Sequence, residues 1–144
     1  MNKAIGSDLK ALFIIQLLSS ALTGLLGTLA PGLIIALSGL DPAAVPVMQQ
    51  AGGLALGYTV GAILSLRAAT WAQVRIFAAA SLMAYGLSLI GAIYYIFIVG
   101  VVSLGLLVIF TACLIMTVGL IYAWRKYDRD MGERPLADSS VKSA

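Results

Sequence analysis

The sequence predicts an all-α integral membrane protein, a four-helix transmembrane bundle with both termini in the cytoplasm. Three observations support this prediction. The 144 residues are 61% hydrophobic and 10% charged, with a mean hydropathy of +1.02. Long uncharged segments alternate with short polar ones, and the basic residues cluster outside the long segments. Soluble domains are about 45–50% apolar and about 25% charged, and disordered chains are more polar still, so both classes are excluded.

The first transmembrane helix is expected over residues 11–30, which carry no charge and match the roughly 20 residues that a bilayer requires. Residues 1–10 are expected to form a cytoplasmic N-terminus. A signal peptide is the alternative for this layout, but the apolar run is longer than the roughly 7–15 residues of a typical signal-peptide core. We therefore expect the helix to be retained.

The second transmembrane helix is expected over residues 47–66. Pro31-Gly32 interrupts the chain before it, and the apolar segment at 33–40 is too short to span, so it should lie at the interface or cap the bundle. Asp41-Pro42 marks a turn. We interpret Asp41 as a turn and cap residue, with cation binding at the outer surface as the alternative.

Two further helices are expected in the uncharged stretch 76–124. As one helix it would be about 73 Å long at about 1.5 Å per residue, whereas a hydrocarbon core is about 30 Å thick. The stretch should therefore cross twice. A turn near Gly100 gives helices over residues 76–97 and 102–124. A short polar connection, 67–75, is expected to precede them.

The distribution of the basic residues predicts the topology. None lies in the first or third connection, and all nine fall before the first helix, between the second and third, or in the tail at 125–144. Basic loops stay in the cytoplasm, so both termini and the solvated tail are expected on the cytoplasmic side of a cell inner membrane. The nine are Lys3, Lys10, Arg67, Arg75, Arg125, Lys126, Arg129, Arg134 and Lys142.

Aromatic and basic side chains near the helix ends are expected to anchor the protein at the membrane interface. Tryptophan and tyrosine prefer headgroup depth because their rings are amphipathic, and lysine and arginine contact anionic headgroups. The expected anchors are Trp71, Trp124, Tyr127, Arg67, Arg75, Arg125 and Lys126.

Small residues at every fourth position form the sharpest pattern of the sequence. Residues four apart share a helix face, and helices in lipid associate through close backbone approach at such faces. Packing inside the bundle is the favoured interpretation, with the second helix at its centre. Contact with another subunit, or with a lipid, quinone or pigment, stays open. The second helix carries Gly53, Gly57, Gly61 and Ser65; the first carries Ser20, Gly24 and Thr28; the third carries Ala80, Ala84, Ser88 and Ala92.

Three polar residues are expected near mid-membrane: Gln16, Tyr58 and Tyr85. Polar side chains at this depth bond across helices, and a buried tyrosine hydroxyl needs a partner. We expect the two tyrosines to bond to each other or to Gln16. Binding of a polar ligand group is the alternative for Gln16.

Several functions are made improbable by what the sequence lacks. It has no histidine and one cysteine, Cys113, so no metal site, no cofactor and no catalytic role is expected. No charged residue lies inside a predicted span, which argues against proton-coupled transport. Neither nucleotide-binding motifs nor a basic stripe with aromatic residues is present, so nucleic-acid binding is not expected.

The order of features resembles a known type of protein. The first helix ends at Ala30-Pro31, a short apolar segment leads to Gly39-Leu40-Asp41-Pro42, and a glycine-rich helix follows. This order is similar to that of small bacterial four-helix membrane proteins of uncharacterised function, loosely of the DoxX type. The resemblance implies the architecture only, and no functional residue is carried over from it.

By elimination, the sequence predicts a non-catalytic accessory or assembly subunit of a larger membrane complex, with electron transport as one setting. Its expected partners are the lipid bilayer and other membrane subunits or further copies of itself. One alternative is a small homo-oligomeric transporter or channel with a pore lined by the second helix. The other is a binder of lipid, quinone or pigment.

Overall fold

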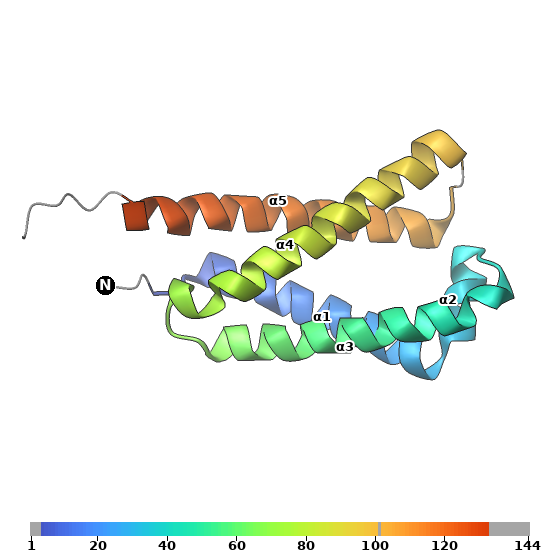
Figure 1. Ribbon diagram of the computed structural model, residues 1–144, viewed down its shortest axis with the longest axis horizontal. Coiled ribbons are helices and arrows are strands. Elements are labelled where there is room, and N and C mark those ends of the chain that lie inside the picture. Colours follow the sequence, from blue (N-terminus) through green and yellow to red (C-terminus); the bar gives the residue numbers. More distant parts are fainter. Residues whose placement is uncertain (1–3, 101, 133–144) are drawn as a thin grey trace, which may run out of the picture.

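Figure 1 shows the protein as a computed structural model, which describes residues 4–100 and 102–132. The described chain is all-α, as predicted, apart from one isolated bridge between Ala4 and Thr70. The helices are α1 (Ser7–Leu29), α2 (Pro31–Ser38), α3 (Val45–Arg67), α4 (Trp71–Tyr94) and α5 (Leu104–Gly132), with a 3₁₀ turn η1 (Pro42–Ala44) and a π-helical turn η2 (Tyr95–Val99).

Three helical segments are long and apolar enough to cross a membrane: Ser7–Leu29, Trp71–Val99 and Leu104–Asp128. The chain is therefore a plausible multi-pass membrane protein. The α3 helix has 23 residues, but Gln49, Gln50 and its glycines lower its hydropathy. A fourth crossing by α3 stays a prediction.

The short connections form where the sequence signals predicted them. Pro31 starts α2 because its ring favours the first helical turn and its missing N–H needs no partner there. Gly39 ends α2 in the left-handed conformation, at φ 67°. The Asp41 side chain caps η1, since its carboxylate accepts a 2.7 Å hydrogen bond from the Ala43 amide. Gly100, at φ 75°, confirms the turn expected there.

The prediction of a polar connection over residues 67–75 is wrong, because the helices on both sides extend into this segment. The α3 helix continues to Arg67 and α4 already begins at Trp71. A capping box starts α4: the Gln73 side-chain oxygen accepts hydrogen bonds from the Ala69 and Thr70 amides, at 2.9 and 3.1 Å. Local capping therefore decides where this helix starts, and the charge of Arg75 does not.

The last helix is also longer than expected. It continues past Trp124 to Gly132, so residues 125–132 form helix rather than the start of a solvated tail. The rest of the expected tail, residues 133–144, lies outside the described part of the chain, as do residues 1–3. The ion pairs described below give the added turns tertiary support.

The long helices form two pairs, α1 with α3 and α4 with α5. In Figure 1, the start of α1 and the end of α5 lie at the same end of the molecule, and α4 diverges from α3 away from that end. We call this end, where the basic residues of the four long helices lie, the basic end. Most of the buried core lies towards the basic end, and its largest fully buried side chains include Trp71, Tyr127, Phe13, Leu9 and Met116.

The α1–α3 pair is held by small residues that allow close backbone approach. Gly27 lies directly against Gly52, and Gly24 lies against Leu56. The Ser20 and Thr59 hydroxyls are 3.0 Å apart and share a hydrogen bond. The expectation that α3 forms the centre of the bundle is wrong, because α4 packs mainly on α5.

Replacing Gly52 with leucine should separate α1 from α3. A Cβ atom at Gly52 would lie 2.6 Å from backbone atoms of Gly27 and Thr28, which cannot move independently. Overpacking of this kind costs about 1–3 kcal/mol or more. We expect Gly52→Leu to lower the thermal unfolding temperature in detergent. Gly53→Leu is the matched control, because a Cβ there meets nothing within 4 Å; equal effects of the two substitutions would contradict the packing described.

Candidate functional site

The glycine stripe of α3 is divided between two environments. A Cβ atom at Gly61 would collide with the Phe77 ring, and Ser65 is buried, so this half packs inside the protein. A Cβ at Gly53 or Gly57 would meet nothing within 4 Å, and both residues are exposed. Packing inside the bundle therefore does not account for Gly53 and Gly57.

Gly53 and Gly57 face away from α1, and α4, whose Phe77 covers Gly61, diverges from α3 away from the basic end (Figure 1). The face of α3 that contacts α1 carries Gly52, Leu56 and Thr59, and consecutive residues of a helix point in directions about 100° apart. The outward face carries Gly53 and Gly57 between larger side chains. We call it the glycine face and define it by the exposed residues Gly53, Leu54, Gly57, Val60 and Leu64.

The small residues of the other helices behave differently. Ser20 and Gly24 of α1 are buried against α3, and the buried Thr28 hydroxyl lies close to Gly52, which confirms this set as a packing face. The set expected on α4 does not form one continuous packed face. Ala92 is buried, Ala84 is half-buried, and Ala80 and Ser88 are exposed.

Gln16 lies fully buried where the two helix pairs meet. Its amide nitrogen donates a 2.8 Å hydrogen bond to the Ser81 hydroxyl of α4, so it bonds across helices as expected. The Gln16 side-chain oxygen is buried without a partner among the described residues. A buried amide with one satisfied group is only partly compensated for its desolvation.

The two mid-membrane tyrosines do not bond to Gln16. The Tyr58 hydroxyl donates a long hydrogen bond, 3.5 Å, to the Ala80 carbonyl of α4. Gln16 and Tyr58 thus bond to different groups of α4, and within the described chain no hydrogen bond joins Gln16, Tyr58 and Tyr85 into one site.

We predict that Ser81→Ala destabilises the fold more than Gln16→Leu. The serine substitution leaves the whole Gln16 amide buried and unpaired, which costs on the order of 1 kcal/mol or more. The leucine substitution removes the buried amide and leaves a serine that can bond to its own helix. Chemical unfolding in detergent would measure both, and a larger loss for Gln16→Leu would contradict this account.

An aromatic cluster closes the basic end. The rings of Trp71 and Tyr127 stack with centroids 5.5 Å apart, and Trp124 meets Trp71 edge-on at 5.4 Å. Trp71 and Tyr127 are each 1% exposed. The sequence predicts these two as interface anchors facing the headgroups, but their side chains instead form part of the core. Trp71 points inward because it opens α4 rather than lying in a connection.

Asp8 connects the start of α1 to the end of α5. Its carboxylate accepts a 2.8 Å hydrogen bond from the Tyr127 hydroxyl and forms a 2.7 Å ion pair with Lys126. The Tyr127 hydroxyl in turn accepts a 2.8 Å hydrogen bond from the Gly6 amide. Sequence analysis missed Asp8. The only feature of the sequence that points to Asp8 is its place in the first turn of a helix, between basic residues.

The basic anchor residues form two groups. Arg75 pairs with Asp128 at 3.3 Å and lies over the Trp124 ring, 5.3 Å from its centroid, while Lys126 pairs with Asp8. Arg67 and Arg125 are exposed and form no ion pair within the described part of the chain. Only the second group is free to contact headgroups or other anions.

Tyr127→Phe should destabilise the basic end while keeping its ring stack. The substitution removes the bonds to Asp8 and Gly6, which together are worth about 1–3 kcal/mol. We expect a lower thermal unfolding temperature. Tyr122→Phe is the control, since Tyr122 is 58% exposed on the same helix and should unfold like the unmodified chain. Equal stability of the two variants would argue against the role of the hydroxyl.

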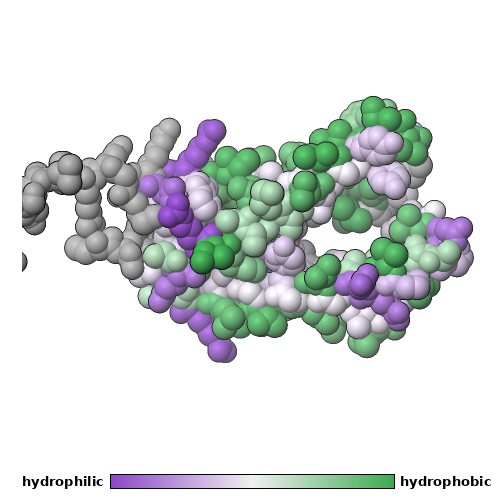
Figure 2. Space-filling view, in the orientation of Figure 1, coloured by the Kyte–Doolittle hydropathy of each residue, from purple (hydrophilic) through white to green (hydrophobic). Residues whose placement is uncertain are grey.

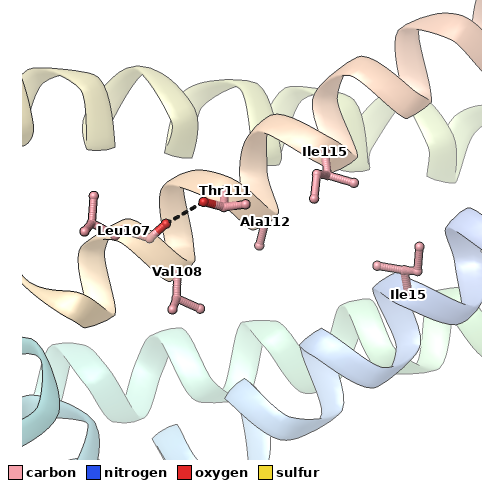
Figure 3. A pocket seen from close by; sticks show the side chains of 6 residues that line it. All are labelled: Ile15, Leu107, Val108, Thr111, Ala112 and Ile115. Carbon is pink, nitrogen blue, oxygen red and sulfur yellow. Dashed lines mark hydrogen bonds between the residues drawn. The ribbon is translucent and has the colours of Figure 1, made fainter.

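An apolar groove lies between α1 and the first half of α5 (Figure 3). Its volume is about 440 Å³, and its lining residues are Ile15, Leu107, Val108, Thr111, Ala112 and Ile115. The one hydroxyl in this lining, that of Thr111, donates to the Leu107 carbonyl of its own helix at 2.9 Å. The groove can therefore accommodate apolar chains but offers no free polar side-chain group to orient a ligand.

The described residues offer little chemistry beyond packing and charge. Cys113 is 5% exposed, as expected for a small apolar core residue, and lies on α5, a helix long and apolar enough to cross a membrane. The described residues contain no group of three or more histidine, cysteine or acidic side chains that could hold a metal ion.

No protein-family model matches the chain, and comparisons with curated proteins and with solved structures give no significant match. The resemblance to the DoxX type stays a prediction.

Proposed function

We propose that the protein is a non-catalytic accessory or assembly subunit of a larger membrane complex, held to its partner through the glycine face of α3. The observation that carries this proposal is the outward position of Gly53 and Gly57, with open space above both. The described helices leave this face uncovered, although its pattern is typical of helix contacts in membranes.

Helices associate in lipid for different reasons than in water. Apolar side chains gain little from leaving lipid for another apolar surface, so close backbone approach supplies much of the association energy. Glycines at positions 53 and 57, beside the exposed Leu54, Val60 and Leu64, leave the backbone of α3 open to close approach. A partner helix with a small or narrow ridge would fit against this face.

The proposal includes a topology. We infer that α3 forms a fourth crossing beside the three apolar helices, and that the basic end faces the cytoplasm of a cell inner membrane. Figure 2 supports this, since hydrophilic side chains gather at the basic end and hydrophobic ones cover much of the middle. The positive-inside rule assigns the basic end to the cytoplasm.

Replacing both Gly53 and Gly57 with leucine should remove the partner while preserving the fold. A Cβ atom at either position meets nothing within 4 Å, so leucine side chains there extend outward and cover the exposed backbone. The tagged protein would be extracted gently from its native membrane and its associated proteins quantified by mass spectrometry. We expect a set of larger proteins at constant ratio, lost at least tenfold in the double variant.

Gly86→Leu is the matched control, because Gly86 of α4 also has open space around it but lies outside the glycine face. It should retain the partners. If the unmodified protein purifies as a homo-oligomer that the double variant disrupts, the glycine face joins copies and the transporter or channel alternative gains support. If both variants retain every partner, the proposal is wrong.

A further inference from the structure

A second groove lies at the basic end, between the last turns of α3 and the first turns of α4, with a volume of about 440 Å³. Its inner part is lined by Gly61, Leu64, Val74 and Phe77, and its mouth by Arg67 and Gln73. The absence of a side chain at Gly61 gives the Phe77 ring its place against α3. The groove is therefore apolar inside and polar at the mouth.

Tyr58 contacts Phe77, one of the residues that line this groove. Its ring lies 6.0 Å from that of Phe77, and its hydroxyl bonds to the Ala80 carbonyl across the two helices. Residues 61 to 67 span about 9 Å of helix at about 1.5 Å per residue. The apolar part can thus cover the upper part of one acyl chain, while the rest of the chain extends into the bilayer.

The mouth of the groove presents donors. Arg67 is the last residue of α3, is exposed, and has no acidic partner in the described chain. The Gln73 oxygen is occupied by the Ala69 and Thr70 amides. Gln73 is exposed, and the two N–H groups of its side chain form no hydrogen bond within the described chain, so they can donate to a ligand. A site with a cation beside amide donors favours an anionic ligand.

We propose that this groove binds an anionic phospholipid, with its phosphate at Arg67 and Gln73 and one acyl chain against Leu64 and Phe77. Charge complementarity carries the choice of occupant: the mouth offers a cation and donors, and the interior offers apolar carbon. The mouth also lies at the basic end, where the helices leave their apolar segments and headgroup phosphates would be found. The site shares Leu64 with the glycine face but includes neither Gly53 nor Gly57, and its lipid-binding test does not require the proposed partner.

The test is native mass spectrometry of the full chain in detergent, titrated with phosphatidylglycerol, phosphatidylcholine or inorganic phosphate. We expect one phosphatidylglycerol to bind in preference to phosphatidylcholine. Arg67→Gln should weaken that binding about fivefold, as expected for one basic residue acting on an anionic lipid. Arg67→Lys should retain most of it, and Leu64→Ser should weaken it while keeping the charge.

Arg125→Gln is the matched control, because Arg125 is also exposed, forms no ion pair within the described chain, and lies at the same end but outside the groove. Equal losses for Arg67→Gln and Arg125→Gln would show general attraction and overturn the site. Equal binding of phosphatidylcholine would overturn the headgroup assignment, and displacement of the lipid by inorganic phosphate would indicate a free-anion site instead. Thermal unfolding of each variant separates loss of binding from loss of fold.

Discussion

The fold depends on one polar connection at the basic end, where Asp8 and Tyr127 join the first helix to the last. Tyr127 donates to Asp8, accepts from the Gly6 amide and stacks on Trp71. The bonds to Asp8 and Gly6 join residues more than a hundred positions apart in the sequence and attach the α1–α3 pair to the α4–α5 pair. Hydrogen bonds to a charged group are stronger than neutral ones, which suits a contact that must hold where the apolar surfaces meet lipid rather than water.

The two helix pairs meet closely at this end and less closely towards the other. Gln16 and Ser81 continue the connection towards mid-membrane, and beyond them α4 diverges from α3 (Figure 1). Divergence leaves surfaces that a compact bundle would cover. The apolar groove beside Ile15 and the outward glycine face of α3 are both such surfaces. In lipid they need no covering by this chain, because hydrocarbon solvates apolar atoms as well as another helix does.

The proposed functions use different levels of the same helix. Gly53 and Gly57 offer a partner helix close backbone approach, whereas Arg67 offers a cation at the membrane boundary beside an apolar groove. A subunit held by protein at one level and by lipid at another resists both rotation and vertical movement in the bilayer. Asp41, the one charged residue between Lys10 and Arg67, is used as a local cap at the opposite end.

The sequence by itself determined the helical class, the long apolar segments, the turn at Gly100 and the gathering of basic residues at one end, because hydropathy and turn chemistry are local properties. It also predicted that Ser20 and Gly24 pack and that Gln16 bonds across helices. Only the tertiary structure decided which residues contact one another. A period of four places Gly53 and Gly57 on one face, but Gly52 shows that the packed face is rotated from it, and periodicity does not report which direction points at a neighbour. Trp71 and Tyr127 carry the composition of interface anchors yet are buried, because their environment depends on the long-range contact with Asp8 and on a helix start set by capping.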